Sequence, residues 1–142
     1  MKEAAALQVV AALIISGDQV LACRRASHKV SPGVWEFPGG KVEVGEEPFE
    51  ALEREIQEEL GLPCRALDSF DISETPMGDQ LIRLHAVICS FNFEGELSST
   101  DHDQFRWLSI NQLDEVEWAK PDLPAVNKLR TLGSLSELNF RD

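Results

Sequence analysis

The chain has no tyrosine, only three cysteines, and 13 basic against 25 acidic residues. The formal net charge of −12 argues against a nucleic-acid-binding surface, on which lysine and arginine must predominate to neutralise phosphates. The cysteines, Cys23, Cys64 and Cys89, are odd in number and lack metal-site spacing, so we expect reduced thiols in a cytoplasmic protein. No apolar run approaches the roughly 20 residues of a membrane-spanning helix. Neither a membrane nor a nucleic-acid polymer is therefore expected as a partner.

The remaining composition is that of an ordinary globular protein, with 43% hydrophobic and 27% charged residues. A length of 142 residues predicts a single domain over residues 1–142, large enough for a core. The apolar start contains Gln8 and meets a Gly17-Asp18 turn, which indicates two hairpin strands and not a signal peptide. The acidity is explained as a solvated exterior, which is compatible with a monomer or a homodimer.

The pattern of apolar residues predicts strands and helices in a non-alternating order, without repeats or linkers. This order indicates a mixed α/β (α+β) domain. The expected strands are 7–15, 19–23, 35–37, 64–73, 81–93 and 104–108, and the expected helices are 48–60, 110–116 (capped by Ser109) and 123–132.

The helix predicted over 48–60 has an unusual acidic face. Pro48 suits its first turn, and Gly61 suits the left-handed position after its last turn. At about 100° per residue, Glu55, Glu58 and Glu59 fall within roughly a 100° arc beside an apolar arc. Their mutual repulsion would be relieved by a hard divalent cation such as Mg²⁺, which prefers oxygen ligands. A solvated acidic helix is the alternative that these three residues alone leave open.

The stretch from residue 40 to residue 62 resembles the signature of the Nudix hydrolase family. The fixed positions of that signature are occupied by Gly40, Glu46, Arg54, Glu55, Ile56, Glu58, Glu59, Gly61 and Leu62. The resemblance implies a mixed sheet sandwiched between helices. It also implies hydrolysis of a nucleoside diphosphate linked to another group, with Mg²⁺, or alternatively Mn²⁺, as the required cofactor.

The same resemblance assigns roles within the signature. Glu55, Glu58 and Glu59 would bind the metal as catalytic glutamates, together with the backbone carbonyl of Gly39. The remaining signature residues are structural: Gly40 and Gly61 belong to the turns, Arg54 would hold a glutamate in a forked ion pair, and Glu46 would steady the loop or the helix start.

The segments Arg24-Arg25 and Trp35–Gly40 resemble the MutT-like branch of the family. An arginine at the position of Arg25 meets the substrate phosphates in that branch, whereas a surface pair at a strand end is the alternative for both arginines. Phe37 would flank the base or belong to the core. Lys41 is a weaker phosphate-binding candidate.

Downstream segments resemble those MutT-like members that hydrolyse CTP: 84–86, 93–97, 101–102 and 121–124. Asp101 matches a glutamate that binds metal or acts as the catalytic base, but it is one methylene shorter. Asp103 and His102 remain substitutes, and polar surface is the alternative for His102. Asp122 matches a base-reading position, where an ionised carboxylate would accept from the amine of cytosine; a cap for the last helix is the alternative.

These residues together predict a Mg²⁺-dependent hydrolase that converts a nucleoside triphosphate to the monophosphate and pyrophosphate, with CTP, dCTP or modified cytosine nucleotides favoured. A diphosphatase that removes oxidised purine nucleotides such as 8-oxo-dGTP is the alternative enzyme. A regulatory Nudix module that binds nucleotide without turnover is the alternative of another class, although all signature glutamates are present. Dinucleotide substrates are disfavoured because no tyrosine is available to stack a second base.

Overall fold

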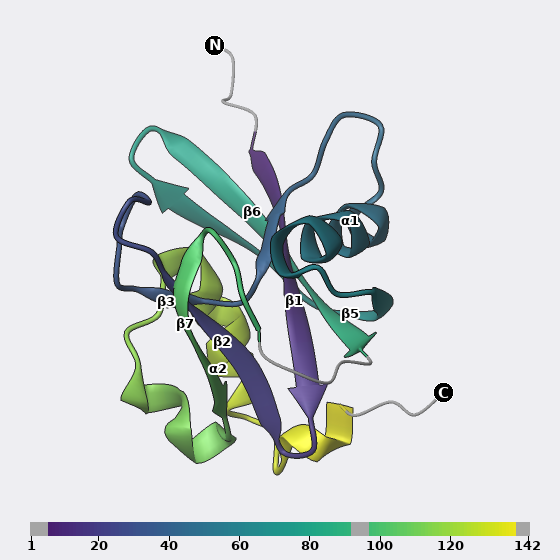
Figure 1. The fold of residues 1–142 in the computed structure, drawn as a ribbon, viewed down its shortest axis with the longest axis vertical. Helices are drawn as coiled ribbons and strands as arrows, with labels where there is room; N and C mark the ends of the chain where they lie inside the picture. The colour runs from purple at the N-terminus through teal and green to yellow at the C-terminus, as the bar shows by residue number, and fades with distance from the viewer. Residues whose placement is uncertain (1–5, 92–96, 139–142) are drawn as a thin grey trace.

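A mixed sheet forms the centre of the molecule in the computed structural model, which describes residues 6–91 and 97–138 (Figure 1). Its strands are β1 (Leu7–Ser16), β2 (Gln19–Arg25), β3 (Trp35–Glu36), β4 (Gly39–Lys41), β5 (Cys64–Met77), β6 (Gln80–Phe91) and β7 (His102–Leu108). β1 pairs in parallel with β6 and antiparallel with β2 and β4, while β5 adds antiparallel to β6. β3 and β7 both pair with β2. The sheet is therefore mixed, as the resemblance to the signature implied.

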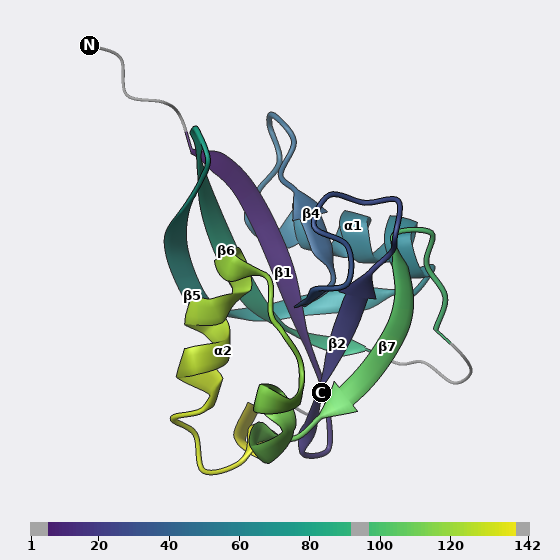
Figure 2. The ribbon, with the colours of Figure 1, turned by 90° about the vertical axis from the view of Figure 1, so that its left-hand side faces the viewer.

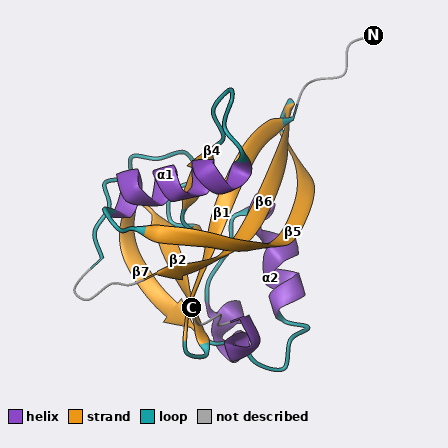
Figure 3. Ribbon diagram, turned by 90° about the vertical axis from the view of Figure 1, so that its right-hand side faces the viewer, coloured by secondary structure: helices purple, strands orange, loops and turns teal. Residues whose placement is uncertain are grey.

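The two α-helices, α1 (Pro48–Leu60) and α2 (Leu123–Leu129), lie on opposite sides of the strands (Figures 2 and 3). Three short 3-10 helices lie near α2 in the sequence: η1 (Ile110–Glu115), η2 (Lys120–Asp122) and η3 (Leu135–Leu138). Successive strand residues face opposite sides of a sheet, so β1 and β6 contribute to two cores. Ala11 and Leu84 pack on the α2 side, whereas Val10 and Val87 pack on the α1 side.

α1 begins and ends where the sequence predicted. The backbone N–H of Glu47 donates to Glu50 Oε1 over 3.0 Å, which closes the first turn. Gly61 adopts the left-handed conformation with φ 67°, and its N–H donates to the Gln57 carbonyl over 3.0 Å. Leu52 and Ile56 are fully buried against the sheet, and they belong to the apolar face of α1.

Several elements differ from the prediction. The segment 110–116 forms the tighter η1 and not an α-helix, and the last α-helix ends at Leu129 instead of residue 132. β5 extends to Met77 beyond the predicted end at residue 73. β4 was not predicted, because three residues are too few to show an alternating pattern. Residues 93–96, used in the family comparison, lie outside the described residues.

The N-terminal hairpin is confirmed. Ile15 pairs with Val20, and Gly17 provides the positive φ of 59° in the turn. Cys23, Cys64 and Cys89 are free thiols. Within residues 6–91 and 97–138, every helix is too short or too polar to cross a lipid bilayer.

Candidate active site

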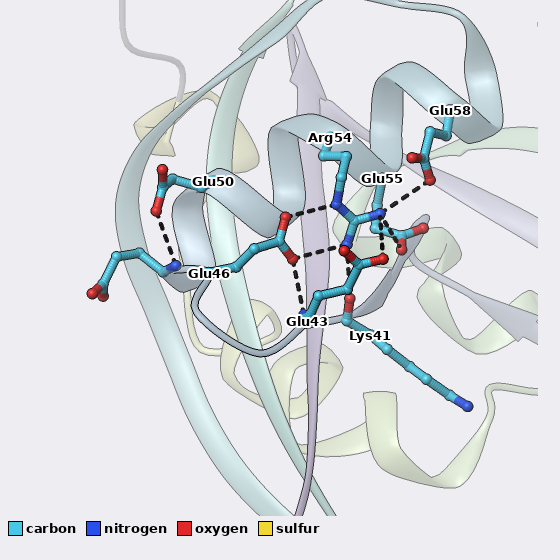
Figure 4. Close-up of polar contacts among 8 residues, drawn as sticks. Lys41, Glu43, Glu46, Glu50, Arg54, Glu55 and Glu58 are labelled. Atoms are coloured by element: carbon cyan, nitrogen blue, oxygen red, sulfur yellow. Dashed lines mark hydrogen bonds and ion pairs between the residues drawn. The ribbon is translucent and has the colours of Figure 1, made fainter.

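Arg54 organises the polar face of α1 (Figure 4). Its guanidinium donates to both carboxylate oxygens of Glu46 in a fork, with Nε 2.7 Å and Nη2 2.9 Å from them. This interaction lowers the pKa of Glu46 to about 2 and raises the pKa of Arg54. Glu46 Oε1 also accepts the backbone N–H of Glu43 over 2.9 Å. Arg54 thereby fastens the loop before α1 to the helix.

The same guanidinium contacts two of the three predicted metal ligands. Arg54 Nη1 donates over 3.0 Å to Glu55 Oε1 and over 3.0 Å to Glu58 Oε2 (Figure 4). Burial raises the pKa of Glu55, and Arg54 opposes that shift. The Glu58 side chain is 61% exposed. Glu55 is therefore a partly desolvated carboxylate, and Glu58 lies at the solvent edge of the pair.

The glycine turn approaches these carboxylates closely. Gly39 and Gly40 lie in β4, opposite Ala11 and Val10 of β1. A Cβ on Gly40 would overlap the Glu55 carboxylate, and it would lie 2.8 Å from Glu55 Oε1. The absence of a side chain at Gly40 thus provides the space that Glu55 occupies. The Lys41 side chain points away from these glutamates (Figure 4).

The third predicted ligand, Glu59, lies inside the protein against His102. Glu59 Oε1 is 2.5 Å from His102 Nδ1, and the two side chains are only 5% and 2% exposed. The pair lacks hydrogen-bond geometry, so Glu59 Oε1 is a buried oxygen without a hydrogen-bond partner among the described residues. His102 Nε2 lies 2.8 Å from Glu36 Oε2. One imidazole therefore bridges carboxylates of α1 and β3.

The charge of His102 follows from this position. Burial lowers the pKa of His102, but the nearby carboxylates of Glu36 and Glu59 outweigh burial and raise it to about 9. The imidazole is consequently a cation at neutral pH. The sequence offered His102 only as a substitute for Asp101, and it did not single out Glu36 at all. The one available signal was that Glu36 belongs to the Trp35–Gly40 segment, which resembles the MutT-like branch.

The other predicted catalytic and phosphate-binding residues surround this bridge. Arg25 Nη1 lies 3.1 Å from Glu36 Oε1, and Arg25 Nε donates to the Val30 carbonyl over 2.6 Å. The Asp101 carboxylate pairs with Lys29 at 3.4 Å. Arg25 is therefore joined to the glutamate network through Glu36 and His102, whereas the Asp101 side chain is directed toward Lys29.

Arg24 and Asp103, for which the sequence left more than one role open, contact each other at the surface. Arg24 Nε lies 2.7 Å from Asp103 Oδ1 in an exposed ion pair. Arg24 thus forms the surface contact that was its alternative explanation. Asp103, a substitute for Asp101, is the partner in this pair.

Asp122 and Phe37 are in direct contact on the α2 side of the sheet. The Phe37 N–H donates to Asp122 Oδ2 over 2.8 Å, and the Asp122 side chain makes no hydrogen bond to cap α2. The cap alternative is therefore wrong. Burial raises the pKa of Asp122 well above its usual value. The Phe37 ring is 3% exposed and lies 4.8 Å from the Trp118 ring between centroids, so Phe37 belongs to the core.

The predicted ligand set is present but not preassembled. Within the described ranges, no three acidic, histidine or cysteine side chains converge on a point that would hold a metal ion. Glu55 and Glu58 face Arg54, while Glu59 faces His102. The donors nevertheless fit a hard cation, because they are carboxylate oxygens and because the buried Glu59 Oε1 has no hydrogen-bond partner within residues 6–91 and 97–138.

Comparison with known proteins identifies the family of this chain. The family model described as NUDIX domain matches residues 6–129. The chain belongs to the Nudix family. As a Nudix hydrolase, it is a member of a family that generally uses divalent metal ions and acts on small nucleotide substrates.

Individual relatives are similar over most of this Nudix chain. It is 31% identical to the CTP pyrophosphohydrolase of Escherichia coli, over 89% of this chain and 93% of that protein. It is 30% identical to the 8-oxo-dGTP diphosphatase of the same organism, over 89% of this chain and 98% of that protein. The solution structure of the Escherichia coli ORF135 protein superposes with a TM-score of 0.77 at 30% identity, covering 91% of each chain.

Proposed function

We propose that this protein is a divalent-metal-dependent pyrophosphohydrolase, which hydrolyses nucleoside triphosphates to the monophosphate and pyrophosphate. The principal support is the arrangement of α1, which carries Glu55, Glu58 and Glu59 and places the Glu55 carboxylate beside Gly40. Among the described residues, the buried Glu59 Oε1 has no hydrogen-bond partner, and burial raises the pKa of Glu55. Both features disfavour a purely structural role, because desolvated carboxylates are costly for folding.

Mg²⁺ would be held by the three glutamates and the Gly39 carbonyl. When bound there, such a cation neutralises phosphate oxygens and lowers the pKa of an attacking water. The protein supplies the positions of the ligands: Arg54 holds Glu55 and Glu58, and His102 holds Glu59. Asp101 adjoins His102 in the chain and remains the proposed base for proton removal.

Arg25 is proposed to bind the substrate phosphates. Its guanidinium is oriented by Glu36 and by the Val30 carbonyl, so its position is defined before substrate binds. Lys41, which is exposed on β4, is the second phosphate contact in this proposal. These positive groups offset the overall net charge of −12 where a triphosphate must approach.

Cytosine nucleotides are the proposed substrates, and Asp122 is proposed to contact the base beside Phe37. One Asp122 oxygen already accepts the Phe37 N–H. The other oxygen can accept from the exocyclic amine of cytosine. A relative named CTP pyrophosphohydrolase at 31% identity supports this preference.

An oxidised purine nucleotide such as 8-oxo-dGTP is the second candidate, and the burial of Asp122 favours it. Since burial raises the pKa of Asp122, the carboxyl group can retain its proton. A protonated carboxyl both donates and accepts hydrogen bonds, as a purine edge with mixed donors and acceptors requires. A relative named 8-oxo-dGTP diphosphatase at 30% identity supports this candidate.

Pyrophosphate release from a panel of nucleotides with Mg²⁺ tests the proposal. A kcat/KM ratio between dCTP and 8-oxo-dGTP above about tenfold, or roughly 1.4 kcal/mol, would decide between the two substrates. Glu58→Gln should lower kcat by a factor of 100 or more, on the order of the loss when a key charge-stabilising group is removed.

Glu50→Gln is the matched control, because it removes a charge from the same helix while the amide oxygen can still accept the Glu47 N–H. Near-native turnover by Glu58→Gln, or an equal loss in both variants, would refute the assignment of Glu58.

A further inference from the structure

Two polar side chains of β5 have no role in the network described above. Ser73 Oγ and Asp71 Oδ2 are buried, and neither has a hydrogen-bond partner among the described residues. A buried polar atom without a partner destabilises the folded protein. Such an atom in a native protein requires an explanation, for example a bound molecule that completes its hydrogen bonds.

The register of the sheet shows which way these side chains face. Ser73 is paired with Leu84 of β6, and Asp71 is paired with Ala86. Leu84 and Ala86 belong to the core cluster on the α2 side. Because opposed residues on neighbouring strands share a face, Ser73 and Asp71 also face the α2 side.

This face of β5 adjoins the residue proposed to contact the base. β5 and β6 both contact η2, and η2 ends at the buried Asp122. Asp122 in turn accepts the N–H of Phe37, two residues before Gly39 of the glycine turn. Across the sheet, Asp71 pairs with Ala86 of β6, Ala86 pairs with Ala11 of β1, and Ala11 pairs with Gly39 of the glycine turn.

The chemistry of these groups selects one part of a nucleotide. Two carboxyl groups on this face, Asp71 and Asp122, offer no positive charge to a phosphate. They favour N–H donors such as the exocyclic amine of a base. The Ser73 hydroxyl adds one group that can both donate and accept, as the neighbouring ring nitrogen or carbonyl of a base requires.

Building on the nucleotide hydrolysis proposed above, we propose that Ser73 and Asp71 bind the polar edge of the substrate's nucleobase together with Asp122, and so help to determine which base is accepted. Ser73 Oγ and Asp71 Oδ2 have no hydrogen-bond partners among the described residues, and the base would supply them. These residues bind the base and do not touch the reacting phosphorus, so their loss changes substrate binding more than turnover.

Ser73→Ala is the central variant. It should raise KM about fivefold to tenfold for the preferred nucleotide while kcat stays within about twofold, because an interaction that is equal in the ground and transition states affects KM alone. The midpoint of thermal unfolding of the nucleotide-free protein should not fall, because the hydroxyl that is removed has no partner there. Asp71→Asn should change the kcat/KM ratio between dCTP and 8-oxo-dGTP at least threefold.

Ser69→Ala is the matched control. Ser69 is on the same strand, but its hydroxyl lies 2.7 Å from His85 Nε2, so this variant should keep the wild-type KM. An unchanged KM in Ser73→Ala for every nucleotide that the wild type hydrolyses would overturn the inference. A fall in the unfolding midpoint of Ser73→Ala greater than that of Ser69→Ala would also overturn it, since it would show a structural hydrogen bond.

A binding titration separates this inference from the proposed reaction. CMP and GMP are titrated into the wild type and Ser73→Ala without divalent cation, so that no turnover is required. If the wild type hydrolyses no nucleotide, the proposed function fails. Weaker binding of either monophosphate by Ser73→Ala would still support the base site, and equal binding of both would overturn it.

Discussion

Alanine substitution at the adjacent glycines Gly39 and Gly40 should affect different properties of the protein, stability in the first case and metal binding and turnover in the second. A Cβ on Gly39 would overlap the backbone carbonyl oxygen of Val10 and lie 2.9 Å from Ala11 Cα. Carbon atoms pack at about 3.5–4.0 Å, so β1 would have to move by roughly 0.6 Å or more. β1 is paired with both β4 and β6, and it cannot move alone. Gly39→Ala should therefore cost about 3 kcal/mol, at the upper end for overpacking.

Gly40→Ala meets a side chain and not a backbone. Its Cβ would overlap the Glu55 carboxylate, which is at the end of a flexible side chain and can rotate away. We expect the free energy of unfolding to change by less than about 1 kcal/mol, since rotation of the Glu55 side chain breaks only its ion pair with Arg54. Displacement of a metal ligand should nevertheless lower metal affinity or kcat by about tenfold or more.

Urea unfolding without metal, Mg²⁺-dependent shifts of the unfolding midpoint, and pyrophosphate release measure these effects separately. Gly39→Ala should lose stability, and Gly40→Ala should lose its response to Mg²⁺ and its turnover. Equal destabilisation of the two variants would show that Glu55 is held as rigidly as the backbone. Wild-type turnover and wild-type Mg²⁺ stabilisation in Gly40→Ala would refute the assignment of Glu55 as a ligand.

Three further predictions concern charged residues. The stabilisation that His102 provides is complete below its usual pKa of about 6.5, and it is lost as the pH rises through about 9. In urea unfolding without metal, the difference in free energy of unfolding between wild type and His102→Gln should shrink by roughly 3 kcal/mol from pH 6 to pH 10. A difference that stays constant with pH would contradict the bridge between Glu36 and Glu59. Because the folded-state pKa of Asp122 is raised, the folded protein retains a proton that the unfolded chain loses above about pH 4. Asp122→Asn should therefore unfold at higher urea than wild type at pH 8 but not at pH 3, and a pH-independent difference would argue against the raised pKa. Arg54→Lys cannot form the fork with Glu46, so its activity should fall at least tenfold as the loop before α1 loosens; full activity would show that charge alone suffices.

Local signals in the sequence were sufficient for the N-terminal hairpin and for both ends of α1, but not for the three-residue β4. Pro48 and Gly61 act within a turn of their own positions, and the glutamate spacing follows from helical periodicity. Contacts between distant segments were not accessible in the same way. His102 was offered only as a substitute for Asp101, with polar surface as its alternative, although it lies buried against Glu59. Asp122 was weighed as a local cap, but its carboxylate instead accepts an N–H 85 residues away in the chain. The contacts of both side chains follow from their burial, and burial depends on the complete fold.

The metal-free arrangement of the glutamates has a consequence for binding. Arg54 contacts Glu55 and Glu58, and His102 contacts Glu59, so each carboxylate has a cation of the protein beside it before a metal arrives. Such pairs limit the repulsion among the glutamates and keep the apo protein folded. In the proposed function, a divalent ion would replace part of these contacts. The fork between Arg54 and Glu46 does not involve Glu55 or Glu58, so it can hold the loop to the helix whether or not these two glutamates contact Arg54.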